Sequence, residues 1–283
     1  MTESARTDHS RIAAIQMVST PSVQENLDAA GRLIDEAAGQ GAQLVALPEY
    51  FCLMGRKDTD KVDARERPGH GPIQEFLAAA ARRHRIWLIG GTLPIEVGDG
   101  ITDRIRNTTL VFAPDGSLAA RYDKIHLFGF RKDAEHYDES RTIQAGRDLV
   151  AFEATLGDQP LRVGLSICYD LRFPELYRGL AFDGAPDLIV VPSAFTYTTG
   201  SAHWEILLRA RAIENQCYVL APAQGGRHGN GRRTWGHSMV VDPWGEVIAV
   251  LPEGEGVVTA ELDEARIEQV RAELPALTHR QCQ

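Results

Sequence analysis

Residues 41–48 read Gly41-Ala-Gln-Leu-Val-Ala-Leu-Pro48, and residues 184–192 read Gly184-Ala-Pro-Asp-Leu-Ile-Val-Val-Pro192. Each stretch is a short apolar run that follows a glycine and stops at a proline, a pattern typical of a strand buried on both faces. Each comes after a segment of helical periodicity, which itself follows a predicted strand. The two stretches therefore predict an α/β fold with a weak internal duplication. Convergence on a common buried-strand pattern is the alternative.

The segments around these two runs supply the other elements. Strands are predicted at 11–18, 43–47, 86–93, 107–112, 118–124, 161–168, 187–191, 218–223, 237–241, 247–251 and 257–262. Helices are predicted behind the capping box Ser22–Glu25, after Pro72, from Pro174, over 203–215 and around Ile267. Two sheets packed face to face, with helices outside both, would accommodate this number of strands. No linker-like stretch divides the chain, so we expect a disordered tail at 1–10 and one domain over 11–283.

The composition excludes several classes of protein. The 283 residues carry a formal net charge of -9, which argues against a general nucleic-acid binder. No apolar run reaches the 18 residues that a membrane span needs, and the first ten residues lack the apolar centre of a secretory signal. The four cysteines, Cys52, Cys168, Cys217 and Cys282, form no Cys-x-x-Cys pair. We therefore expect no disulfide framework, no structural zinc, no membrane partner and a cytoplasmic location.

Three reactive side chains follow predicted strands at the point where each strand ends. Cys168 closes the run 161–168 before a helix, and a side chain at such a turn is presented outward, near free backbone N–H groups. Glu49 follows the strand at 43–47, and Lys124 is the last residue of the strand at 118–124; a charge placed there is costly unless it faces a cleft. A thiol needs a base or a nearby cation to react at neutral pH. Taken alone, each residue also has a structural interpretation. The cysteine would simply pack in the core, and the glutamate and the lysine would be charges exposed to solvent.

The segments that contain these residues together resemble a known family. Leu-Pro-Glu-Tyr50, Tyr-Asp-Lys-Ile-His126 and Ile-Cys-Tyr-Asp-Leu-Arg-Phe-Pro-Glu175 are similar to the three catalytic segments of the nitrilase superfamily of carbon–nitrogen hydrolases. Further matches run from 200 to 205, from 209 to 219 and from 236 to 245, so the resemblance covers nearly the whole chain. It implies a four-layer αββα sandwich and an assembly of at least two subunits.

The resemblance also implies a mechanism without a metal or an organic cofactor. Glu49 would act as general base, Cys168 as nucleophile, and Lys124 with the Tyr169 N–H as the donors that stabilise the oxyanion. A small amide would be hydrolysed to acid and ammonia through a cysteine thioester. The family has a second carboxylate between the lysine and the cysteine; Glu139 fits best, and Asp138 is the competitor. His126, His203 and His237 lie in separate segments, so structural hydrogen bonding is favoured over metal ligation.

The substrate is predicted from a smaller set of residues. Arg172 offers a guanidinium for a substrate carboxylate, with a buried ion pair to Glu175 or Asp170 as the alternative. Phe195 and Thr199 are expected on the opposite wall. The glycine-rich loop 225–231 is expected at the rim, where Arg227 and His228 would reach a longer substrate.

Within the superfamily the chain looks closest to amidases of deaminated glutathione. Segments 192–195, 223–228 and 274–280 support this branch, whereas 124–128 and 198–200 lean towards ω-amidases that act on α-ketoglutaramate. Enzymes that hydrolyse nitriles or N-carbamoyl compounds remain a further alternative, because they would share the same three catalytic residues.

Overall fold

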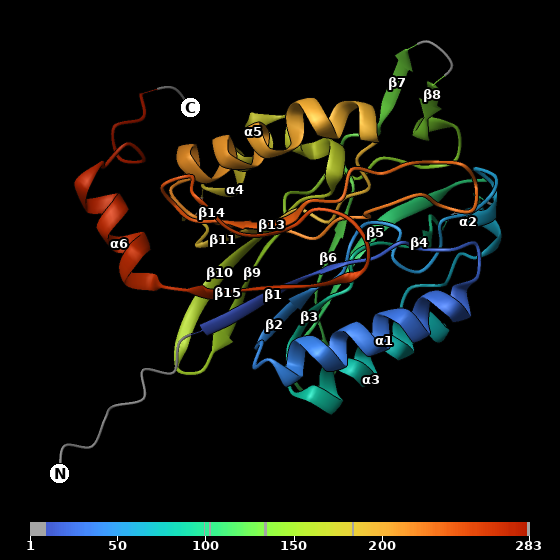
Figure 1. The fold of residues 1–283 in the computed structure, drawn as a ribbon, viewed down its shortest axis with the longest axis horizontal. Coiled ribbons are helices and arrows are strands. Elements are labelled where there is room, and N and C mark those ends of the chain that lie inside the picture. The colour runs from blue at the N-terminus through green and yellow to red at the C-terminus, as the bar shows by residue number, and fades with distance from the viewer. Residues whose placement is uncertain (1–9, 99, 102, 133–134, 183, 282–283) are drawn as a thin grey trace.

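Two mixed sheets dominate the molecule (Figure 1). The computed structural model describes residues 10–98, 100–101, 103–132, 135–182 and 184–281. The first half of the chain contains β1 (Ser10–Gln16), α1 (Val23–Gly39), β2 (Leu44–Ala46), α2 (Asp60–Asp63), α3 (Pro72–His84), β3 (Trp87–Ile89), β4 (Leu93–Glu96), β5 (Ile105–Phe112) and β6 (Leu118–Asp123). A small hairpin, β7 (Gly129–Lys132) and β8 (Glu135–Asp138), and a short 3-10 turn, Glu139–Arg141, follow.

The second half continues with β9 (Ala151–Leu156), β10 (Gln159–Leu165), a 3-10 turn at Cys168–Arg172, α4 (Pro174–Leu180), β11 (Leu188–Val190), α5 (Tyr197–Asn215), β12 (Tyr218–Ala221), β13 (Ser238–Val241), β14 (Val247–Leu251), β15 (Gly256–Leu262) and α6 (Glu264–Glu273). The order in the seven-stranded sheet is β15-β1-β2-β3-β5-β4, with β6 paired to β5. The order in the six-stranded sheet is β14-β13-β12-β11-β10-β9.

The same topology occurs in both sheets. Parallel strands β1, β2 and β3 are joined by helices, as are β10, β11 and β12, and antiparallel strands extend each set. The runs at 41–48 and 184–192 contain β2 and β11, the middle parallel strand of each sheet. The predicted repeat is therefore present in the topology.

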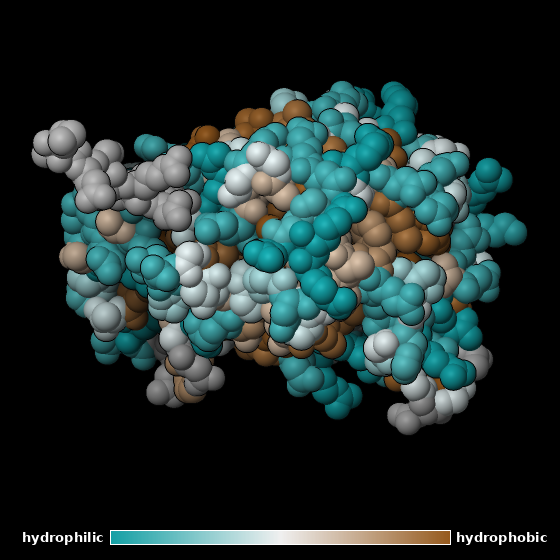
Figure 2. Space-filling model, turned by 90° about the horizontal axis from the view of Figure 1, so that it is seen from below, coloured by the Kyte–Doolittle hydropathy of each residue, from teal (hydrophilic) through white to brown (hydrophobic). Residues whose placement is uncertain are grey.

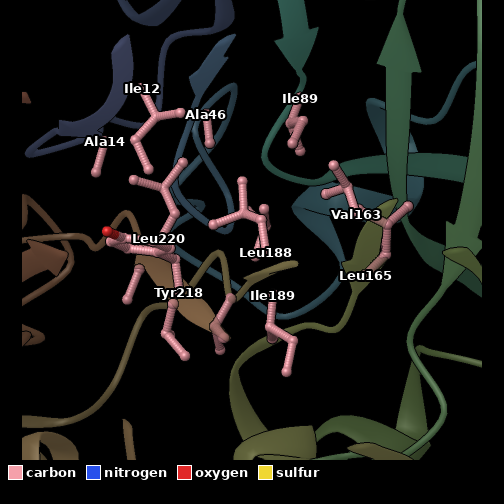
Figure 3. Close-up of a cluster of buried hydrophobic side chains, with 14 of the residues drawn as sticks. Ile12, Ala14, Ala46, Ile89, Val163, Leu165, Leu188, Ile189, Tyr218 and Leu220 are labelled. Atoms are coloured by element: carbon pink, nitrogen blue, oxygen red, sulfur yellow. The ribbon is translucent and has the colours of Figure 1, made fainter. Parts of the chain in front are cut away.

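Successive side chains along a strand point to opposite faces of its sheet, and this alternation produces the four predicted layers. Ile12 and Ala14 point into a core shared with Val163 and Leu188 of the other sheet, and Figure 3 shows these side chains facing one another. Ala13, one position along β1, belongs instead to a second core beneath α1 and α3. Because both faces of each sheet are covered, the middle parallel strands β2 and β11 are apolar throughout. Figure 1 shows α1 and α3 below the sheets and α4 and α5 above them, which confirms the αββα sandwich.

The outer surface of the α1–α3 layer is mostly polar. Figure 2 views the molecule from this side, and hydrophilic residues cover most of the face, with small apolar areas between them. This distribution agrees with the amphipathic pattern of the helices. No helix in the described part of the chain has the length and apolarity to cross a bilayer.

Several predicted boundaries were wrong. The strand expected at 86–93 breaks into β3 and β4 at Gly91, which has a φ of +52° and no space for a Cβ, since one would lie 2.2 Å from the Pro48 carbonyl oxygen. Helix α5 begins at Tyr197 rather than 203, capped by the Thr196 side chain. Strand β10 ends at Leu165, and β9, the β7–β8 hairpin and α2 were missed. Ser10 already pairs in β1, and the rest of the expected tail, 1–9, lies outside the described residues.

The predicted capping box at α1 is only half formed. The Ser22 hydroxyl accepts from the Glu25 N–H at 3.4 Å. The Glu25 carboxylate accepts from the Thr20 hydroxyl at 2.8 Å, and the Ser22 N–H donates to that same hydroxyl. In a complete capping box the Glu25 carboxylate would accept directly from the Ser22 N–H; here the Thr20 hydroxyl links the two groups instead.

Candidate active site

The ends of strands from both sheets bring the three predicted catalytic residues together. Glu49 follows β2 and Lys124 follows β6, both in the seven-stranded sheet. Cys168 follows β10 in the six-stranded sheet, and its thiol lies against the Glu49 carboxylate. The cluster therefore lies where strands of the two packed sheets end.

Glu49 is fixed through both carboxylate oxygens. Oε1 accepts from Lys124 Nζ at 2.8 Å and from Asn107 Nδ2 at 3.0 Å. Oε2 accepts from the Ala194 N–H at 3.0 Å. Since the side chain is 1% exposed, these donors replace the water that a carboxylate otherwise needs.

Glu139 is the second carboxylate of the cluster. Its Oε2 lies 2.9 Å from Lys124 Nζ and accepts from the Phe128 N–H at 2.8 Å. Its Oε1 accepts from the Tyr50 hydroxyl at 2.6 Å. Asp138, the competitor, accepts from the Ser140 N–H and hydroxyl and has no contact with the lysine. Tyr50, Asn107 and Phe128 had no predicted role, although Tyr50 stands within one of the family-like segments.

The electrostatics keep the cysteine protonated and the lysine charged at rest. Burial raises the pKa of the Cys168 thiol, the Glu49 charge raises it further, and Lys124 opposes both. Burial alone would lower the pKa of Lys124, but the charges of Glu139 and Glu49 outweigh it and raise that pKa. The resting site is thus a neutral thiol beside an ammonium held between two carboxylates.

The backbone around Cys168 forms a strained turn. Cys168 has a φ of +48°, which is unusual for a residue with a side chain, and its N–H donates to the Pro192 carbonyl at 3.0 Å. The Tyr169 N–H, by contrast, donates to no other residue in the described ranges. The Tyr169 N–H is therefore available to a ligand near the thiol.

Asp170 anchors this turn and was missed as a structural residue. Its fully buried carboxylate accepts from the Ile167 N–H at 2.9 Å and from the Tyr122 hydroxyl at 2.7 Å. It also accepts from the His126 N–H at 3.0 Å and contacts His126 Nδ1 at 2.8 Å. Because Tyr122 lies two residues before Lys124, these bonds tie the cysteine turn to the lysine.

The cluster opens into a narrow cavity lined by residues of both halves of the chain. All three predicted substrate residues line it, namely Arg172, Phe195 and Thr199. Arg172 lies with its guanidinium carbon 5.3 Å from the Phe195 ring centroid and contacts His203 Nδ1 at 3.2 Å. No carboxylate in the described part of the chain pairs with Arg172, so the alternative of a buried ion pair was wrong. Lining residues that were not predicted to contact substrate are Tyr50, Phe128, Ala194, Thr196 and Arg232.

The glycine-rich loop contributes a different cation from the one expected. Arg227 is exposed and His228 is buried, and neither lines the cavity. His228 instead contacts the Ser19 carbonyl at 3.0 Å, and burial lowers its pKa. Arg232, just beyond the predicted loop, lines the cavity and stacks 5.1 Å from the Tyr137 ring centroid. The sequence contains three neighbouring arginines here, and only the packing of the loop selects one.

The described residues contain no group of three or more His, Cys, Asp or Glu side chains placed to hold a metal ion. His126 contacts Asp170, and His237 contacts the Trp235 carbonyl at 3.0 Å. These two histidines therefore have structural partners.

Comparisons with known proteins agree with this geometry. The carbon-nitrogen hydrolase family matches residues 11–272. A deaminated glutathione amidase of Synechocystis sp. is 45% identical over 95% of this chain and 97% of its own. The structure of Saccharomyces cerevisiae Nit3, a nitrilase-superfamily member, matches with a TM-score of 0.85 at 33% identity over 99% of this chain and 100% of that one. A mutant of the amidase from Nesterenkonia sp. AN1, in which acrylamide has undergone Michael addition at the active-site cysteine, matches with a TM-score of 0.74 at 27% identity, over 95% of this chain and 100% of that one. The chain therefore belongs to the carbon-nitrogen hydrolase family of amide-hydrolysing enzymes.

Proposed function

We propose that this enzyme hydrolyses amides of a 2-oxo dicarboxylic acid, with deaminated glutathione as its preferred substrate. The observation that carries the proposal is one cavity lined by Cys168 and Glu49, which binds the buried Lys124 at 2.8 Å. The same cavity is lined by two arginines, Arg172 and Arg232, that have no carboxylate partner among the described residues. The activity of the Synechocystis relative, a deaminated glutathione amidase, supports the choice of substrate.

Attack begins with transfer of the Cys168 proton to Glu49. The sulfur adds to the amide carbonyl, and the negative oxygen is stabilised by the Lys124 ammonium and the Tyr169 N–H. Because the proton moves within the buried cluster, the total charge of the site stays constant while the oxyanion forms. The acrylamide adduct on the active-site cysteine of the Nesterenkonia amidase supports a cysteine nucleophile in this fold.

The leaving nitrogen then takes the proton from Glu49, since an amide anion is too basic to depart. Water, activated by the same carboxylate, hydrolyses the thioester. Glu139 holds Lys124 from the opposite side at 2.9 Å, so the ammonium stays directed at the reacting carbonyl. Tyr50 and the Phe128 N–H hold Glu139 in turn.

The nature of the product depends on the amide. Deaminated glutathione has only peptide-type amides, so cleavage of its γ-amide releases a dipeptide with a free amino group rather than the predicted ammonia. α-Ketoglutaramate has the same acyl part on a primary amide and releases ammonia. Both substrates present the same 2-oxo acid to the thiol, and Arg172 is the guanidinium placed beside Tyr169 and Phe195 to bind its carboxylate.

The test compares the two amides directly. Release of 2-oxoglutarate is measured for both at equal concentration, and a larger kcat/KM for deaminated glutathione is expected. A Cys168→Ala variant is the control and should be inactive on both. A larger kcat/KM for α-ketoglutaramate would instead establish the ω-amidase alternative, and turnover of a nitrile or an N-carbamoyl compound alone would refute both assignments.

We also propose a homodimer that works in the cytoplasm. Phe182, after α4, is 76% exposed, and Ile206 and Ile213 on α5 are exposed as well; such apolar side chains are suited to a subunit interface. A catalytic thiol must remain reduced, and the cytoplasm maintains that state.

A further inference from the structure

A second cavity adjoins the active site and is strongly cationic. It is open to solvent and shares two lining residues, Tyr50 and Arg232, with the catalytic cavity. Its cationic lining residues are Arg56, Lys57, Lys61 and Arg232, against a single carboxylate, Asp58. None of these four cations forms an ion pair within the described ranges.

The loop before α2 and Lys61 of α2 form much of the cavity wall, and the Asp60 side chain holds this loop in place. The Asp60 carboxylate accepts from the Arg56 and Lys57 N–H groups, the latter at 3.0 Å. This carboxylate is therefore occupied by backbone donors, and the arginine and lysine side chains are free to bind a ligand. Lys61 lies with its Nζ 5.7 Å from the Tyr50 ring centroid, on the shared wall.

We propose that this cavity is the subsite for the leaving group and that its cations bind the carboxylate of an anionic amine, such as a dipeptide. The inference rests on the proposed function. Tyr50, which directly follows Glu49, lines both cavities, whereas Arg172 packs against Tyr169 and Phe195 beside the cysteine turn and lines only the catalytic one. The leaving group thus departs along the Tyr50 wall, towards the second cavity.

The size of the leaving group fits this route. Two residues in extended form span about 7 Å, so the terminal carboxylate of a dipeptide would lie beyond Tyr50, in the region of Lys61 and Lys57. A primary amide has no group there. The second cavity therefore provides the discrimination between the two amides, because remote binding energy is available only to the longer one.

The test uses the substrate ratio as its readout. Lys57→Gln and Lys61→Gln should each lower the ratio of kcat/KM for deaminated glutathione to that for α-ketoglutaramate by about tenfold, the loss of one charge-assisted contact. Lys132→Gln, an exposed lysine on β7 that lines neither cavity, is the matched control and should leave the ratio within about twofold.

A change in the substrate separates direct contact from indirect effects. With the wild-type enzyme, conversion of the terminal carboxylate of deaminated glutathione to an amide should lower kcat/KM about tenfold. With the Lys57→Gln/Lys61→Gln enzyme, the same change in the substrate should cause no further loss of kcat/KM. An unchanged ratio, or an amide form that reacts as well as the acid with wild type, would overturn the subsite while leaving the proposed function intact. Failure of the wild type to hydrolyse either amide would refute the proposed function itself.

Discussion

Replacing Lys124 by Met separates the two roles of the buried lysine. The side chain is 0% exposed and its Nζ lies 2.8 Å from Glu49 and 2.9 Å from Glu139. Methionine fills a similar volume but leaves two carboxylates facing each other without a cation. Loss of one partner from a buried ion pair costs about 3–5 kcal/mol of folding free energy. Loss of one donor to the oxyanion lowers kcat by about 10²–10³.

The double variant Lys124→Met/Glu139→Gln distinguishes these effects. It removes one of the two facing charges, so the free energy of unfolding measured in urea should recover part of the loss. The kcat for release of 2-oxoglutarate should not recover, because no cation is restored near the carbonyl. Recovery of kcat to within about tenfold of wild type would refute the role of Lys124 at the oxyanion and reduce it to a neutralising charge.

Four further outcomes follow from the same geometry. A rapid acid quench during turnover should trap an acyl adduct on Cys168, and mass spectrometry that maps it to another cysteine would exclude this nucleophile. Arg172→Lys keeps the charge but loses the planar fork, so KM for α-ketoglutaramate should rise about tenfold with little change in Tm; Arg227→Ala, outside the cavity, should leave both values unchanged. Light scattering should give at least twice 31.1 kDa, and Phe182→Glu should shift it towards the monomer. Burial alone would raise the pKa of Glu139, but Lys124 lowers it below its usual 4.5, so the folded state binds this proton less readily than the unfolded chain. Its stabilisation is therefore full above pH about 4.5 and is lost as the pH falls through the folded pKa; urea unfolding of Glu139→Gln should show a flatter acid limb, and an unchanged limb would contradict the assignment.

Local patterns predicted the strands that are buried on both faces. The runs at 41–48 and 184–192 were assigned correctly, because a continuous apolar stretch between a glycine and a proline has few alternatives. The break at Gly91 was not predicted, since it depends on the close approach of the Pro48 carbonyl, which lies just beyond the end of β2. The exposed hairpin β7–β8 was missed because no buried face gives it an alternating pattern.

The sequence by itself determined the family, the four layers and the chemical types at three strand ends. Only the tertiary structure decided which groups meet. The Ala194 N–H reaches Glu49 from 145 residues away, and Asp170 bonds Tyr122 across 48 residues. The tertiary structure also placed Arg232, rather than Arg227, at the cavity. The physical reason is that strand ends are fixed by local apolar patterns, whereas these contacts depend on how two sheets pack and on how one loop folds against them.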